Sequence, residues 1–300
     1  MRGRSSAEAA LLVAVMIWSL NFTAVKVGIG SLEPLAFSVL RFGVAAIVTI
    51  AVMLARGGVP RYRRQDLGLL LGASLFGITL NQAALVGALS ITNAANVALL
   101  VGTIPIWTTI IASATRQEQV GLSHWLAVGA GMAGVALIVG GGARSGLGAI
   151  NFGGEALALM TAVSWAAYTV LIRPLMHRYT ALSVSLFTMV AGTLALLPFA
   201  VPELLAQDWG SIPTSAWLIV VYTGVVGISL TNILYFTGVQ RVGPSRAAIY
   251  TYLEPFLGVL FAVILLNDSV TPVQVAGGIV IGVAVAFGRR RRELVIAPQQ

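Results

Sequence analysis

A glutamate and a proline interrupt an otherwise apolar run, "IYTYLEPFLG", at positions 254 and 255. A carboxylate deep in an apolar segment could bind a substrate ammonium, carry a coupled proton, or pair with a basic group at a gate. It could also tie two helices together without any further role. A charge in the middle of a membrane span costs at least about 2.5 kcal/mol, so Glu254 must face the protein interior with a partner or be protonated. Glu254 is therefore the first candidate for a substrate-binding residue.

Two prolines occupy matching positions in two apolar runs. Pro255 cannot donate a backbone hydrogen bond, which would leave the carbonyl of Thr251 without its helical partner, and Pro105 does the same to Val101. Protein groups or a wet cavity can satisfy such carbonyls, whereas lipid cannot. We expect helix kinks at Pro105 and Pro255 that either expose carbonyls at mid-depth or serve packing alone.

Aromatic and amide side chains recur on shared helix faces. Residues three or four apart lie on one face of a helix, so Trp18 shares a face with Asn21, Trp165 with Tyr168, and Tyr250 with Glu254. A cavity lined in this way suits a small amphipathic or zwitterionic solute, with cation–π contact to an ammonium. Ordinary packing between helices is the alternative. Besides Glu254, the predicted substrate-binding residues are Trp18, Asn21, Asn81, Trp107, Trp165, Tyr168, Asn232, Tyr235 and Tyr250.

Acidic residues follow two of the apolar runs at matching positions. Glu118 and Asp268 would lie on opposite sides of a membrane. Each could latch a gate against Lys26 or Arg173, or against a helix N-terminus, which favours negative charge. A solvated loop carboxylate without such a role is the alternative.

The composition explains what must position these residues. Of 300 residues, 58% are hydrophobic and 9% are charged, whereas soluble domains carry about a quarter charged residues. Runs of about 20 apolar residues, long enough to span a bilayer, recur with short connections that leave no room for a soluble domain. We therefore predict an all-α polytopic membrane protein with ten transmembrane helices, at residues 8–28, 35–55, 67–89, 94–115, 122–141, 154–174, 180–201, 214–238, 244–266 and 271–288.

The basic residues are distributed unequally between the two sides. If the ten spans alternate, 15 of the 18 lysines and arginines fall on the side of the two termini. The positive-inside rule then places both termini in the cytoplasm. The net charge of +8 therefore indicates membrane topology and not a nucleic-acid partner.

The two halves of the sequence resemble each other. "EAALLVAVMIWSLNFTAVK" (8–26) matches "EALALMTAVSWAAYTVLIR" (155–173), and "GITL" (77–80) matches "GISL" (227–230). Pro105 also matches Pro255, and Glu118 matches Asp268. Each half holds five spans, so the second must be inverted, as in many secondary transporters. We predict repeats at 1–143 and 150–290 and a cytoplasmic tail at 291–300.

The segment "IWSLNFTAVKVGIGSLEPLAFSVLRFGVAA" is similar to the start of an EamA-type repeat of the drug/metabolite transporter superfamily, and "YTYLEPFLGVLFAVILLNDSVTPVQVAGGIVIGVAV" resembles the end of the second repeat. Ser19 stands where the family usually has glycine, and "LND" stands for Leu-Gly-Glu. Length and aromatic residues are most similar to the YddG-type amino-acid exporters. The resemblance implies a carrier that exports an amino acid or a related metabolite through a bacterial inner membrane.

Other classes of function find little support. The only histidines, His124 and His177, lie at span ends, and neither a nucleotide-binding loop nor a cysteine occurs. We therefore expect no enzyme, no cofactor and no bound metal. A sensor or scaffold usually adds a soluble domain, and a channel needs a selectivity element repeated around an axis. We predict an alternating-access exporter of small metabolites, for which one subunit suffices to build the site; efflux of cationic drugs is the alternative.

Overall fold

The computed structural model describes residues 2–58, 60–91, 94–141, 152–266 and 271–289, and these form helices joined by short connections. They make ten rods, which confirms the predicted ten-helix fold. The rods are α1 (Arg2–Gly28), α2 (Pro34–Ala55), α3–η1–α4 (Arg64–Ser74, Leu75–Leu80, Asn81–Ile91), α5–α6 (Ala94–Val101, Ile104–Ala114), α7 (Leu122–Gly141), α8 (Phe152–Leu175), α9 (Ala181–Ala206), α10–η3–α11 (Thr214–Tyr222, Thr223–Leu230, Thr231–Val242), α12–η4–α13 (Pro244–Ile249, Tyr250–Tyr252, Leu253–Leu266) and α14 (Pro272–Arg289). A short 3₁₀ turn, η2 (Trp209–Ser211), precedes α10.

Six of these rods are long and apolar enough to cross a membrane by length and composition. They are Pro34–Ala55, Arg64–Ile91, Leu122–Gly140, Phe152–Leu175, Ala181–Ala206 and Thr214–Val242. Shorter apolar helices at Ser6–Asn21, Leu99–Ala114 and Pro272–Gly288 belong to three of the remaining rods. The rod Pro244–Leu266 is divided by a 3₁₀ segment.

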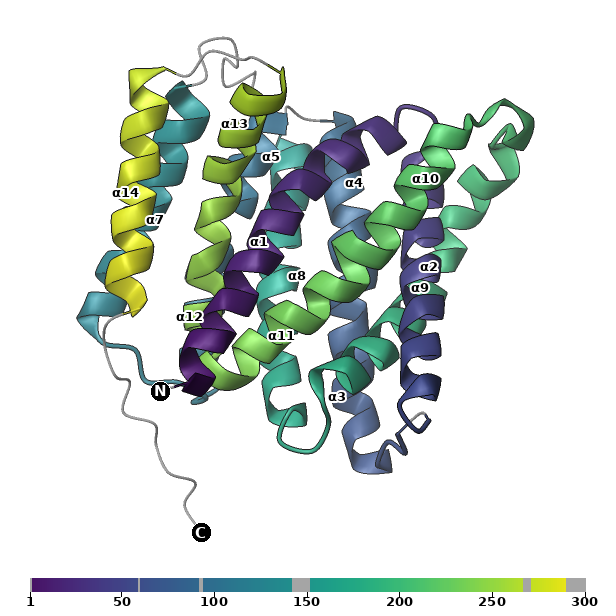
Figure 1. Ribbon diagram of the computed structural model, residues 1–300, viewed down its shortest axis with the longest axis horizontal. Helices are drawn as coiled ribbons and strands as arrows, with labels where there is room; N and C mark the ends of the chain where they lie inside the picture. Colours follow the sequence, from purple (N-terminus) through teal and green to yellow (C-terminus); the bar gives the residue numbers. More distant parts are fainter. Residues whose placement is uncertain (1, 59, 92–93, 142–151, 267–270, 290–300) are drawn as a thin grey trace.

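The start of α1 and the end of α14 lie at the same end of the molecule (Figure 1). We call this the arginine-rich end, because Arg56, Arg116, Arg173, Arg178, Arg241 and Arg246 stand in or beside its connections. This is the end that the charge distribution assigns to the cytoplasm.

The helix contacts follow the repeat. Helix α1 packs against α11, and its counterpart α8 packs against α4. Helix α2 pairs with its own counterpart α9, and α7 pairs with α14. In the last pair, a Cβ at Gly134 would lie 2.9 Å from the carbonyl oxygen of Gly277, so only glycine permits this approach. Each repeat therefore binds the other through the same set of helices.

Two π-helical segments interrupt matching rods. Segment η1 contains "GITL" and η3 contains "GISL", the two motifs that match between the halves. A Cβ at Gly77 would lie 2.3 Å from the ring of Tyr168, and a Cβ at Gly227 would lie 2.2 Å from Oδ1 of Asn21. Since Tyr168 and Asn21 are themselves counterparts, the two repeats cross twice, each time with a π-helical glycine beneath a polar side chain.

Candidate functional site

Five aromatic rings from three helices form a cluster where the repeats meet. Ring centroids lie 5.4 Å apart for Trp18 and Trp165, 5.1 Å for Trp18 and Tyr235, and 5.0 Å for Tyr168 and Phe236. Trp165 also contacts Tyr168 at 5.5 Å and Tyr235 at 6.0 Å. Helix α1 thus contributes one ring, and α8 and α11 contribute two each. The structure brings four predicted residues together and adds Phe236, which the sequence analysis did not single out.

Two residues of this ring cluster, Trp18 and Tyr168, form hydrogen bonds to elements of the second repeat. Nε1 of Trp18 donates to the carbonyl of Gly227 in η3 at 3.1 Å. The hydroxyl of Tyr168 lies 2.9 Å from that of Thr188 on α9. Each edge of the cluster is therefore anchored to a helix of the second repeat.

One buried polar atom at the cluster, Oδ1 of Asn21, lacks a hydrogen-bond partner among the described residues. A buried polar atom without a partner costs about 1–3 kcal/mol, and a ligand could supply the missing bond. The chemistry of the site is that of aromatic faces with neutral hydrogen-bonding groups.

Glu254 lies in the first turn of α13, half-buried and close enough to Tyr235 to interact with it electrostatically. Within the described part of the chain, no hydrogen bond or ion pair links Glu254 to another residue. The carboxylate is therefore available to a cationic group.

Two amide side chains on α4, Asn81 and Gln82, link α2 of the first repeat to α8 of the second through hydrogen bonds. Nδ2 of Asn81 donates to the carbonyl of Thr161 on α8 at 3.0 Å, and Nε2 of Gln82 donates to Oδ1 of Asn81 at 3.0 Å. Oε1 of Gln82 accepts from Nη2 of Arg41 at 2.6 Å. Asn81 is thus held by these hydrogen bonds, beside α8 and apart from the rings.

Three other predicted residues lie outside the ring cluster. Nε1 of Trp107 donates to the hydroxyl of Thr103 one turn earlier, at 3.1 Å. Asn232 is buried on α11. Tyr250 is buried within the 3₁₀ segment η4 and lines a small recess at the arginine-rich end together with Glu8 and Arg246.

The helices carrying the two prolines are interrupted just before them. Gly102 and Thr103 separate α5 from α6, whose second residue is Pro105. The 3₁₀ segment η4 ends three residues before Pro255. Both rods are therefore interrupted at matching positions of the two repeats, just before Pro105 and just before Pro255.

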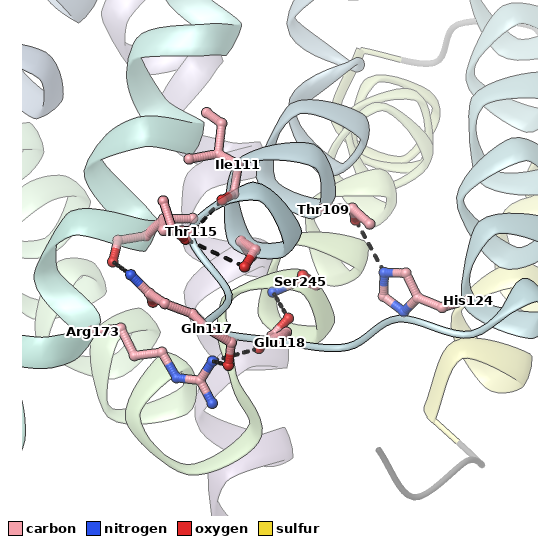
Figure 2. A network of polar contacts seen from close by, with 10 residues as sticks. Thr109, Ile111, Thr115, Gln117, Glu118, His124, Arg173 and Ser245 are labelled. Atoms are coloured by element: carbon pink, nitrogen blue, oxygen red, sulfur yellow. Dashed lines mark hydrogen bonds and ion pairs between the residues drawn. The ribbon is translucent and has the colours of Figure 1, made fainter. Parts of the chain in front are cut away.

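Glu118 joins three helix ends at the arginine-rich end (Figure 2). Its Oε1 accepts from Nη1 of Arg173 at 3.0 Å, and its Oε2 accepts from the backbone N–H of Ser245 in the first turn of α12 at 3.3 Å. Arg173 also donates to the carbonyl of Gln117 at 3.0 Å. We call Glu118, Arg173 and Ser245 the Glu118 latch. The sequence offered an arginine or a helix N-terminus as alternative partners, and Glu118 contacts both.

The approach to Glu118 requires a glycine. Gly243 has φ +89°, and a Cβ there would lie 2.1 Å from Oε1 of Glu118. The Glu118 side chain is 1% exposed and that of Arg173 is 24% exposed. Burial raises the pKa of Glu118, although Ser245 and Arg173 oppose this shift.

The matching elements at the other end of the molecule cannot be placed. Four predicted features lie outside the described part of the chain: the side chain of Lys26, residue Asp268, the linker between the repeats, and the tail after residue 289. Among the described residues, no three His, Asp or Glu side chains gather closely enough to bind a metal ion.

Comparisons with known proteins agree with this architecture. The model of the EamA-like transporter family matches residues 5–140 and 152–288. A solved crystal structure superimposes with a TM-score of 0.81 at 23% identity, covering 95% of this chain and 98% of its own, which supports the fold alone.

Several relatives match over most of their length. A probable terminal-alkyne amino-acid exporter of Streptantibioticus cattleyicolor is 27% identical over 292 residues, 97% of this chain and 95% of its own. An uncharacterized transporter of Archaeoglobus fulgidus is 24% identical over 274 residues, covering 90% and 92%. An uncharacterized inner membrane transporter of Escherichia coli is 26% identical over 280 residues, covering 88% and 84%.

Proposed function

Because the chain belongs to the EamA-like transporter family, we propose that this multi-pass membrane transporter exports amino acids or similar small metabolites by alternating access. The observation that carries the proposal is the ring cluster, built by both repeats at their interface. Inverted-repeat transporters bind their substrates at this interface near the membrane midplane. Rocking of one repeat against the other would then expose the rings to each side in turn.

The side chains around the rings favour an aromatic or other neutral amino acid. The aromatic faces provide apolar and cation–π surfaces. Oδ1 of Asn21 can accept a hydrogen bond that no described residue donates, and Glu254 lies near Tyr235 to receive an ammonium. The similarity to YddG-type exporters supports this substrate class, as does the name of the relative from Streptantibioticus cattleyicolor, a probable amino-acid exporter.

We assign the Glu118 latch to the gate at the arginine-rich end. It joins the end of α8 and the start of α12 to the connection after α6, so opening this end must separate at least two of the three. By the repeat, Asp268 and Lys26 would act at the opposite end. The charge distribution and the inner-membrane relatives support a bacterial plasma membrane location with both termini in the cytoplasm.

Uptake into proteoliposomes tests this function. Purified full-length protein would be reconstituted at zero membrane potential, with radiolabelled amino acids and with or without a pH gradient. We expect uptake of some aromatic or neutral amino acids above empty liposomes. Acceleration only under the gradient would assign a proton to Glu254, whereas equilibration that ignores the gradient would indicate a facilitator.

Cationic drugs are the second candidate substrates, because Glu254 offers a carboxylate without an ion-pair partner among the described residues. Uptake of a lipophilic cation such as tetraphenylphosphonium, with no uptake of any amino acid, would favour this alternative. No uptake of either class would favour a sensor or scaffold and contradict the proposed function.

A further inference from the structure

Arg41 is a charged side chain enclosed within the helix bundle. It lies two turns into α2 and is 6% exposed. Its Cζ lies 5.4 Å from the ring centroids of both Phe37 and Phe42. Cation–π contacts hold the guanidinium between two rings but do not neutralise it. Because the side chain is buried, Arg41 does not extend to the membrane surface.

No described acidic side chain compensates this charge. Asp66 pairs with Arg178, Glu118 pairs with Arg173, and Glu203 accepts from the backbone of α2. Among the described residues, no ion pair joins Arg41 to Glu254 in the first turn of α13. A buried cation without a counter-ion is costly, and in membrane proteins such groups mark substrate pathways.

The hydrogen bonds of Arg41 leave half of one edge unused. Nε and Nη2 form the edge of a guanidinium that binds both oxygens of a carboxylate. In Arg41, Nη2 donates to the neutral amide oxygen of Gln82 at 2.6 Å, while Nε is buried with no partner among the described residues. A carboxylate could accept hydrogen bonds from both Nε and Nη2 of Arg41. Gln82 would then lose its bond to Arg41 and keep its bond to Asn81.

The backbone of Arg41 lies against the same π-helical segment as the side chain of Asn21. A Cβ at Gly224 would lie 2.6 Å from the carbonyl oxygen of Arg41, and one at Gly227 would lie 2.2 Å from Oδ1 of Asn21. The two glycines stand less than one turn apart on η3, so Arg41 and Asn21 flank the same π-helical segment. Among the described residues, Oδ1 of Asn21 is an acceptor without a partner and Nε of Arg41 is a donor without one.

We propose that Arg41 binds the carboxylate of the transported solute, while Asn21 and the rings bind its amine and side chain. This inference rests on the proposed function and deepens it, because it limits the substrates to solutes that carry a carboxylate. Nε is enclosed in the present conformation. The carboxylate therefore reaches it only when the packing of α2 against η3 and α4 opens during transport.

The first test compares an acid with its amide. Uptake and binding of L-phenylalanine and L-phenylalaninamide would be measured with wild-type protein, binding by the ligand-induced rise in Tm. We expect a preference of about ten- to a hundredfold for the acid, the typical effect of a charge-assisted bidentate hydrogen bond. Equal handling of both would overturn the inference and leave the proposed function standing. If neither is taken up, the comparison is made with an amino acid that the panel shows to be transported and with its amide, and failure of the whole panel would overturn both.

The second test removes the guanidinium. Arg41→Gln should reduce the ratio of acid to amide uptake to about one, while Arg56→Gln on the exposed connection after α2 serves as the matched control. Arg41→Lys keeps the charge without the fork and should give an intermediate ratio. If either Arg41 variant retains the wild-type ratio, Arg41 is a tie between helices only. The wild-type ratio decides the question if both variants fail to fold.

Discussion

The two places where the repeats cross use the same backbone with different side chains. At one crossing, Tyr168 fills the space above Gly77, is fully buried, and bonds to Thr188. At the other, Asn21 covers Gly227 and its Oδ1 has no described partner. The Tyr168 crossing is therefore complete without a ligand, whereas the Asn21 crossing lacks a hydrogen bond. We infer that, in an inverted repeat, one of two matching contacts can stabilise the fold while the other binds substrate.

Alanine substitutions at the two π-helical glycines test this comparison with the largest expected effect. Gly77→Ala forces a methyl group against a fully buried ring, whereas Gly227→Ala meets a small amide. Overpacking costs about 1–3 kcal/mol, and we expect Gly77→Ala at the upper end. Thermal unfolding of the purified variants checks this, with Gly72→Ala in open space as the control. A larger loss at Gly227 would contradict the comparison.

Loss of Trp165 should reduce transport more than loss of Trp18. Trp165 contacts four other rings of the cluster, and Trp18 contacts two. We expect Trp165→Ala to lower the initial uptake rate at least about tenfold, because it removes the ring that contacts every other ring of the cluster. Trp217→Ala, at an exposed position, is the control. Normal uptake by folded Trp165→Ala would exclude the rings from the site.

The Glu118 latch should depend unequally on its two partners. Arg173→Gln leaves a nearly enclosed carboxylate without its ion pair, whereas Glu118→Gln leaves an arginine that can reach water. We expect Arg173→Gln to open the arginine-rich end more than Glu118→Gln. The chain contains no cysteine, so labelling of a single cysteine introduced at Ser123 reports opening. Equal labelling of both variants would contradict the unequal roles.

The same labelling should depend on pH. Burial raises the pKa of Glu118, so its carboxyl binds a proton more readily in the latched arrangement than when opening exposes it to water. Lowering the pH towards this raised pKa therefore favours the latched arrangement, and raising the pH above it favours opening. Labelling should fall as the pH falls in wild type but not in Glu118→Gln. An unchanged pH response in Glu118→Gln would assign the effect to another group.

The smallest expected effects separate stability from transport at the two crossings. Tyr168→Phe loses one buried hydrogen bond and should destabilise the protein by about 1 kcal/mol with little change in uptake. Asn21→Ala removes an acceptor that has no described partner and should leave Tm almost unchanged while reducing uptake. Melting curves and uptake rates of both variants check this. A loss of uptake in Tyr168→Phe together with a loss of stability in Asn21→Ala would contradict the comparison.

Much of this architecture follows from the sequence because its physical signals are strong. Apolar runs of bilayer length predict the ten rods to within a few residues, except that α1, α9 and α11 extend by a turn or more beyond the predicted ends. The internal repeat selects Trp18, Trp165 and their neighbours, since a shared pattern places them at related positions. The difference between the two crossings was not predictable, because the hydrogen bond of Tyr168 to Thr188 depends on how closely α9 approaches α8.

Other residues left no readable signal in the sequence. A π-helical segment holds more residues per turn, which a continuous apolar pattern conceals, although "GITL" and "GISL" marked both places. Phe236 is one apolar residue among many on α11. Arg41 was visible as a charge within a span, but its half-used edge depends on Gln82 from another helix.

The pair of π-helical segments also bears on how the protein arose. Such segments are rare, well under 1% of residues in globular proteins, so two independent origins at matching positions in two halves would be a strong coincidence. A single ancestral five-helix chain that already carried the irregular turn accounts for both. In this account the irregular turn preceded the duplication, and Tyr168 and Asn21 above it are positions at which the two halves now differ.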